Sequence, residues 1–353
     1  MDRLDILPDG DIILAVSGSL ELRVSSVVLS MTSPVFKTML GPHFAEGQAL
    51  RRNMTGLPHV VTLPDDGAEP MKTLCLVSHH QTKAIHFSSC TVARATFVIE
   101  LVDLADKYDC MDIIRLPAAS WLAAVNIESL IRTKKIACAE AAFKLDDATF
   151  FGRCTKTLVL DGEVDLWDPA EGASPCRHSI LDAVRKTENC AAKVVTGMID
   201  GMVTNAGDRL GAGYKHRCVD NWMTKDCEYN TAAVGTFLRA LCAAQLWTPS
   251  SRSRKLRDIF RNVQALEVPT VTLISPCRTC LDRATEDILE VFERDIRRVQ
   301  NAVQAIFTSV CLDCLKKIGD GYSTCRTPHF CEWTFIDQDG VGRLNYDHAK
   351  LGE

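Results

Sequence analysis

The sequence predicts an α+β protein, in which a small sheet flanked by helices near the N-terminus is followed by an all-helical region. Short apolar runs bounded by turn residues lie between residues 11 and 67 and are typical of strands. Beyond them apolar residues recur at helical spacing. The 353 residues also exceed what a single hydrophobic core usually serves, so we expect more than one compact unit.

Strands are expected over Asp11–Val16 and Leu20–Val24, joined by a turn at Gly18 and Ser19. A third strand is expected over His59–Gly67 and ends in a proline-aspartate turn. These three strands would form the sheet of the N-terminal domain.

Between the second and third strands, apolar residues recur at mixed three- and four-residue spacings from Val27 to Leu40. This pattern predicts one or two short helices. Ser33 would cap the second helix and Pro34 would lie in its first turn, where serine and proline are favoured.

Later helices are predicted from longer periodic segments. Ala95–Cys110 is strongly amphipathic, and Leu145-Asp146-Asp147 predicts a turn between two further helices. The patterns divide the chain into an N-terminal arm (1–8), the α+β domain (9–120), a helical extension (121–166), a linker (167–175), a helical cysteine-containing region (176–330) and a weakly ordered tail (331–353).

Composition limits the partners that we expect. A net charge of -5 gives no electrostatic footprint for nucleic acid. No apolar run approaches the length needed to cross a membrane, and the acidic N-terminus lacks the apolar centre of a signal peptide. We therefore expect an intracellular protein of the cytoplasm or nucleus that binds other proteins.

Catalytic motifs are absent from the sequence, so we expect no enzyme. His79 and His80 are adjacent and would point apart, which favours a solvated helix end over a shared metal. The pairs Asp65-Asp66 and Asp146-Asp147 lie at predicted turns, where aspartate commonly bonds the backbone.

Sixteen cysteines are many for such a chain. Most lie singly in apolar runs, where a thiol acts as a small hydrophobic group. Cys218, Cys227, Cys277 and Cys280 form a candidate site for a structural zinc ion, because the last two form a C-x-x-C pair at a predicted helix start. A redox pair and plain thiols are the alternatives at these four cysteines.

A second C-x-x-C pair, Cys311 and Cys314, continues the apolar stripe of the last long predicted helix, which favours core packing. Cys325, His329 and Cys331 have the side chains of metal ligands but fall near a proline, and they form a weaker candidate.

The order of elements in residues 9–120 resembles a BTB/POZ domain, and fungal BTB-domain proteins are the most similar. The matching residues are Asp11, Val24, Leu29, Ser33, Phe36, Leu40, Phe44 and Glu46, then Leu63-Pro64-Asp65-Asp66 and Leu104-Ala105-Asp106-Lys107-Tyr108-Asp109-Cys110. In two places the sequence differs. Ser25 stands where a histidine is usual, and an aromatic pair is missing after Cys75.

The resemblance implies a non-enzymatic module for self-association and partner recruitment. It implies a homodimer interface at Leu4, Ile6, Val27, Val28 and Met31. It also implies a surface for a cullin scaffold, as in a substrate adaptor of a ubiquitin ligase, at Phe44, Glu46 and Tyr108. Phe44 could equally close the core beneath its loop. The alternative function is a zinc- or thiol-dependent helical regulatory module, acting in transcription.

Overall fold

The computed structural model describes residues 2–52, 57–86, 90–162, 174–211, 228–247, 255–270, 288–306, 308–316, 325–326, 332–337 and 340–345. The chain forms two compact units, and each is built from separate segments. Unit 1 contains Met1–Thr157, Ala170–Ile180 and Val310–Glu353. Unit 2 contains Leu158–Pro169 and Leu181–Ser309.

Unit 1 begins with a four-stranded sheet of order β1-β3-β2-β4. The strands are β1 (Asp2–Asp5), β2 (Ile12–Val16), β3 (Leu20–Val24) and β4 (His59–Leu63). β2 pairs antiparallel with β3 and parallel with β4, and β1 pairs parallel with β3. Every residue of β2 is buried, as expected for a central strand with covered faces.

The turn between β2 and β3 uses left-handed backbone at Ser17 (φ +44°) and Gly18 (φ +68°). Glycine adopts this conformation without steric cost, which explains its place in the turn. The predicted hairpin is therefore confirmed, with the tight part of the turn one residue earlier than expected.

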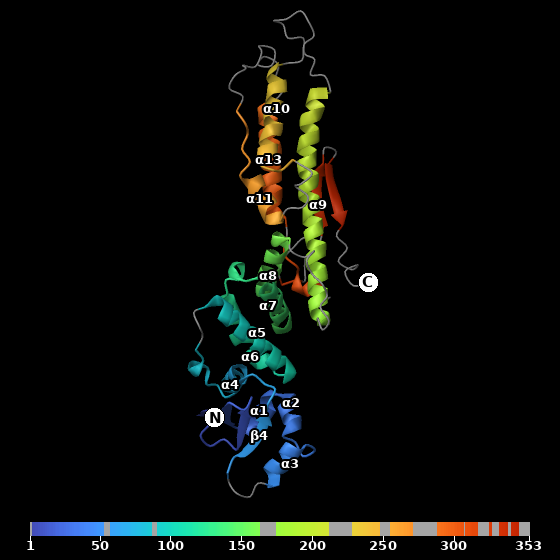
Figure 1. Cartoon of the computed structure of the whole chain (residues 1–353). Coiled ribbons are helices and arrows are strands. Elements are labelled where there is room, and N and C mark those ends of the chain that lie inside the picture. Colours follow the sequence, from blue (N-terminus) through green and yellow to red (C-terminus); the bar gives the residue numbers. More distant parts are fainter. Residues whose placement is uncertain are drawn as a thin grey trace, which may run out of the picture. The chain divides into compact units, whose positions relative to one another are not determined.

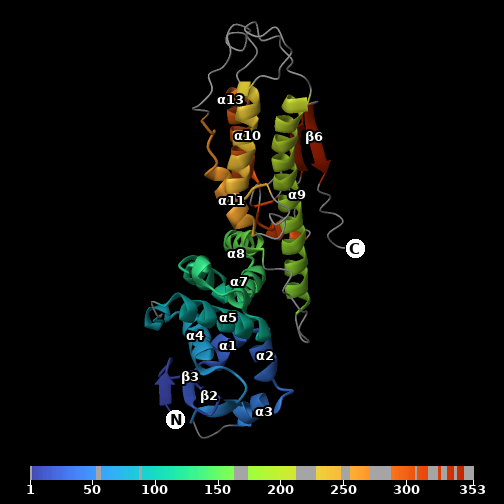
Figure 2. The ribbon, with the colours of Figure 1, turned by 45° about the horizontal axis from the view of Figure 1, so that its top comes forward.

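Helices lie beside this sheet, and α1, α4 and α5 lie on the same side of its strands (Figure 2). They are α1 (Ser26–Thr32), α2 (Pro34–Met39), α3 (Ala45–Arg52), α4 (Ala68–Ser78), α5 (Thr91–Lys107) and α6 (Met111–Ala123), with a short 3-10 helix η1 (Thr82–Ala84). α4 packs on β3, α1 and α5, and α5 packs on α6. The contacts among these helices and the sheet form the core of unit 1.

Unit 1 continues with η2 (Ile127–Ser129), α7 (Arg132–Leu145) and the start of α8 (Ala148–Asp161). The predicted turn between these helices is confirmed, because Asp146 ends α7 with a left-handed φ of +60°. Much later in the chain, α14 (Leu312–Leu315) belongs to the same unit, although the sequence placed it in a separate helical region.

Unit 2 is helical and includes most of α9 (Pro175–Gly211), with α10 (Glu228–Ala243), α11 (Leu256–Gln264) and α13 (Ile288–Ala305). α13 packs along α10 and contacts α11 (Figure 1). Phe237 and Phe292 stack there with ring centroids 4.2 Å apart. Within the described residues, no helix has the length and apolar character required to cross a membrane.

The predicted α+β class holds in its coarse form: a small N-terminal sheet is followed mostly by helices. The described residues between the sheet and residue 330 are mostly helical, as the sequence predicts. β5 (Glu332–Asp337) and β6 (Gly340–Asn345) pair antiparallel within the segment expected to be a weakly ordered tail.

Candidate functional site

The start of α1 is fixed by Asp11, which precedes β2. Its Oδ1 accepts a hydrogen bond from the Ser26 backbone N–H at 2.7 Å, and its Oδ2 accepts from the Ser26 hydroxyl at 2.5 Å. A carboxylate is favourable at a helix N-terminus, where backbone N–H groups lack intrahelical acceptors. This contact sets which face of α1 points outward.

The outward face of α1 carries two apolar side chains, four residues apart. Val27 is 64% exposed and Met31 is 82% exposed, whereas Val28 is half-buried. Leu4 is half-buried on the edge strand β1, and Ile6 is 2% exposed. Of the residues expected at a dimer interface, Val27 and Met31 are exposed on the same helix, whereas Ile6 belongs to the core.

A pocket of about 330 Å³ lies against α2, lined by Pro34, Val35, Thr38, Met39 and Phe44. Phe44 is 48% exposed, so its ring is partly available to a partner instead of closing the core. Glu46 is half-buried in the first turn of α3. Glu46 follows the pocket residue Phe44 by two positions in the sequence.

Tyr108, expected beside these two residues, is instead 3% exposed. Its ring stacks on Phe36 at 4.4 Å, and its hydroxyl donates to the buried Asp66 at 2.6 Å. Burial and this carboxylate raise the pKa of Tyr108 far above its usual value. Lys107 also pairs with Asp66 at 2.6 Å. Tyr108 therefore supports the core under α2 and presents no surface to a partner.

Three thiols from the C-terminal part of unit 1 form a second site. The Sγ atoms of Cys311, Cys314 and Cys325 all lie within 4.8 Å of one another, and the group could hold a metal ion. Cys314 Sγ and Cys325 Sγ are 3.6 Å apart. In a tetrahedral zinc site with bonds of about 2.3 Å, two sulfur atoms lie about 3.8 Å apart, so this spacing fits.

Burial and the neighbouring thiols raise the pKa of Cys314 well above its ordinary value. Thiolates crowded in a low-dielectric site repel one another, and a bound cation removes that cost. The cluster is thus suited either to neutral thiols or to thiolates around a metal ion.

The cluster differs from the metal site expected from the sequence. Cys218, Cys227, Cys277 and Cys280 lie outside the described residues. The prediction that Cys311 and Cys314 continue a long helix is wrong, because α13 ends at Ala305 and Cys311 precedes the separate helix α14. The C-x-x-C spacing and the later Cys325 were the available signals, but their proximity depends on how the chain folds back.

Neither the models of known protein families nor the curated proteins gave a match to this chain. The BTB/POZ resemblance expected from the sequence therefore stays a prediction. Tyr108 lies at the centre of one set of contacts: it stacks on Phe36, donates to Asp66, and accepts a 2.5 Å hydrogen bond at its carbonyl from the Ser33 hydroxyl.

Proposed function

We propose that the N-terminal part of unit 1 is a non-enzymatic protein-interaction module of BTB/POZ type, which pairs with a second copy of itself. The observation that carries the proposal is the exposed apolar pair Val27 and Met31 on α1. Neighbouring exposed apolar side chains on a rigid helix are typical of binding surfaces. β1 is an edge strand of the sheet formed by the described residues, and a second chain could extend such an edge.

Light scattering on the full chain at tens of micromolar tests self-association. We expect a dimer for the wild type and a monomer for the double variant Val27→Ser, Met31→Gln, because the paired apolar surface is lost. Leu116 is also 82% exposed, but on α6, so Leu116→Gln is a matched control that should remain dimeric. A monomeric wild type removes this proposal.

We further propose that the Phe44 pocket and Glu46 bind a cullin-type scaffold, as expected of a ubiquitin-ligase adaptor. An aromatic anchor beside a charge is a common arrangement at binding hot spots. Co-precipitation of a cullin with the full chain should be lost in Phe44→Ala, Glu46→Ala. Val60→Ala, at an exposed site on β4, should retain it. Failure of the wild type to recover any cullin would end the adaptor proposal.

The second candidate function is that of a zinc-dependent module, and the cluster of Cys311, Cys314 and Cys325 favours it. Soft thiolate ligands select zinc among the common divalent ions, and a site of this kind contributes directly to folding. The ion would therefore be structural. His329 and Cys331 follow Cys325 in the sequence but lie outside the described residues.

Elemental analysis of protein purified without chelators tests this site. We expect about one zinc per chain in the wild type and in the control Cys190→Ser, and less than about a tenth in Cys311→Ser, Cys314→Ser, since structural sites hold zinc tightly. If this double variant still contains zinc but the double variant Cys277→Ser, Cys280→Ser does not, the metal is bound at the second pair and not at the cluster. A wild type without zinc removes the candidate.

A further inference from the structure

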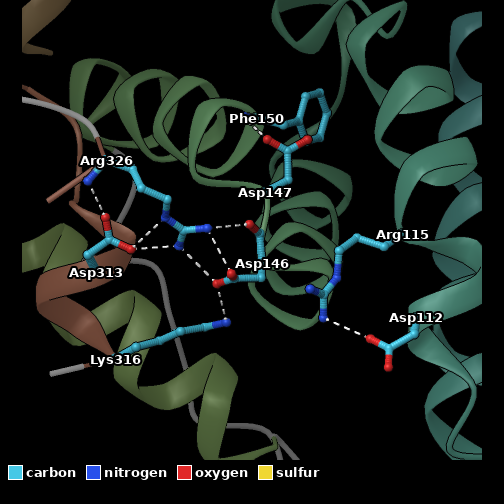
Figure 3. Close-up of polar contacts among 8 residues, drawn as sticks. All are labelled: Asp112, Arg115, Asp146, Asp147, Phe150, Asp313, Lys316 and Arg326. Atoms are coloured by element: carbon cyan, nitrogen blue, oxygen red, sulfur yellow. Dashed lines mark hydrogen bonds and ion pairs between the residues drawn. The ribbon is translucent and has the colours of Figure 1, made fainter. Parts of the chain in front are cut away.

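Arg326 lies between two carboxylates that are far apart in the sequence (Figure 3). Its Nη2 donates to Asp313 Oδ1 at 2.6 Å, and its Nη1 donates to Asp146 Oδ2 at 2.7 Å. Nη1 also donates to the backbone carbonyl of Asp146 at 3.0 Å. One guanidinium thus joins the end of α7 to α14.

The two segments that contain Asp313 and Arg326 also carry the three cysteines. Asp313 lies between Cys311 and Cys314, and Arg326 directly follows Cys325. The Arg326 backbone N–H donates to Asp313 Oδ2 at 2.7 Å. Because this N–H belongs to the peptide bond after Cys325, the hydrogen bond holds Cys325 beside the other two thiols.

Further contacts attach this assembly to the helical hairpin of α7 and α8. Lys316 Nζ pairs with Asp146 Oδ1 at 2.8 Å and lies 4.7 Å from the centre of the Phe143 ring. The Val310 backbone N–H donates to Thr155 Oγ1 at 3.0 Å in a buried position. The segment from Val310 to Lys316 is therefore docked at both of its ends.

The charges of this network are balanced, two carboxylates against two cations. The hydrogen bond from Arg326 is the main reason that the pKa of Asp146 is lowered to about 2. Asp313 is only 2% exposed, so loss of Arg326 would leave a buried carboxylate without its main partner. Such a change is costly and would release the backbone beside Cys325.

We propose that the cysteine cluster and the Asp146–Arg326–Asp313 network form one metal-coupled clasp, which fastens the C-terminal segment of unit 1 onto the α7–α8 hairpin. The inference rests on the proposed zinc site. Arg326 is a positioning residue that holds Cys325 in place for the ion. Coupling between two binding events is reciprocal, so zinc strengthens the docking and the docking strengthens zinc binding.

Competition with a chromophoric chelator measures the zinc affinity of the full chain. Hydrogen-bond partners just outside a metal's ligands typically affect affinity by about 10–100-fold, and we expect Arg326→Gln to weaken zinc binding by this factor. Arg326→Lys should give an intermediate affinity, because one ammonium cannot reach both carboxylates in the same way. Arg153→Gln is the control, since Arg153 contacts backbone carbonyls of unit 1 away from the clasp.

Amide hydrogen exchange can be measured on the wild type, so this test does not require any variant to fold. Removal of zinc should raise exchange at residues 310–316 and leave α4 unchanged. Zinc binding that is equally tight in Arg326→Gln, or exchange that is indifferent to zinc, would overturn the clasp while leaving the zinc site intact. A wild type that binds no zinc would refute both.

Discussion

The imidazole of His79 connects the end of α4 to the start of α1. Its Nε2 is 3.1 Å from the Ser25 backbone N–H, and its Nδ1 is 2.8 Å from the Cys75 carbonyl. The partners assign the tautomer: Nδ1 donates and Nε2 accepts. Ser25, which is the N-cap of α1, therefore receives the imidazole of a residue at the end of α4.

Burial lowers the pKa of His79 from its ordinary value of 6.5, and His80 lowers it further, although the hydrogen bond to Cys75 opposes both effects. Below pH 6.5 the unfolded chain therefore binds more protons than the folded chain. The stabilising contribution of neutral His79 is complete above this pH and is lost as the pH falls through the folded-state pKa.

Urea unfolding between about pH 7.5 and pH 5 checks this prediction. The wild-type midpoint should fall on acidification, and the decrease should be smaller in His79→Gln. His43→Gln removes an exposed imidazole and should behave like the wild type. An identical decrease in His79→Gln and the wild type would contradict the assignment.

The hydrogen bond between Tyr108 and Asp66 leads to a second prediction. The Asp66 carboxylate is buried, and the Tyr108 hydroxyl is one of its two hydrogen-bond donors given above. Tyr108→Phe preserves the stacked ring but removes that donor, so we expect a loss of about 1–3 kcal/mol in the free energy of unfolding. In a double-mutant cycle, Asp66→Asn should make the Tyr108→Phe change much less costly. Additive losses would show that the two groups do not interact.

Among the secondary-structure elements, α2 is set by Ser33. The hydroxyl of Ser33 accepts from the Phe36 N–H at 3.0 Å and donates to the Tyr108 carbonyl, and the residue is 1% exposed. Ser33→Ala removes the helix cap and leaves a buried carbonyl with one donor fewer. We expect a loss of about 1–3 kcal/mol by chemical denaturation. Ser30→Ala, in α1, should change stability by less than about 0.5 kcal/mol.

The sequence predicted this helix start correctly because the cap is local: Ser33, Pro34 and Phe36 lie within one turn. The hairpin of β2 and β3 and the turn at Asp146 were predictable for the same reason. Burial of Tyr108 was not, because it depends on Asp66, which lies 42 residues away. The cysteine cluster was missed for a similar reason: Cys325 and Arg326 reach their partners only after the chain returns to unit 1.

At the scale of the whole molecule, unit 1 is closed by a segment that follows unit 2 in the chain. Val310 and Leu312 are buried, and Arg326 donates hydrogen bonds both to Asp313 and to Asp146. The boundaries expected from the sequence placed these residues in a C-terminal region apart from α7 and α8. Residues that are far apart in the sequence therefore belong to the same compact unit. Removal of the C-terminal segment should destabilise α7 and α8, which lie far earlier in the sequence.

Two truncated chains, 1–330 and 1–309, test this closure. The longer one keeps the docked segment and should unfold like the full chain. The shorter one loses buried Leu312, and loss of a buried leucine side chain alone costs about 2–5 kcal/mol, equivalent to roughly 4–20 °C in the melting temperature of unit 1. Amide exchange should rise in α7 and α8, whereas α10 and α13 should keep their protection because they belong to unit 2. Equal protection of α7 and α8 in both truncated chains would show that the segment contributes nothing to unit 1.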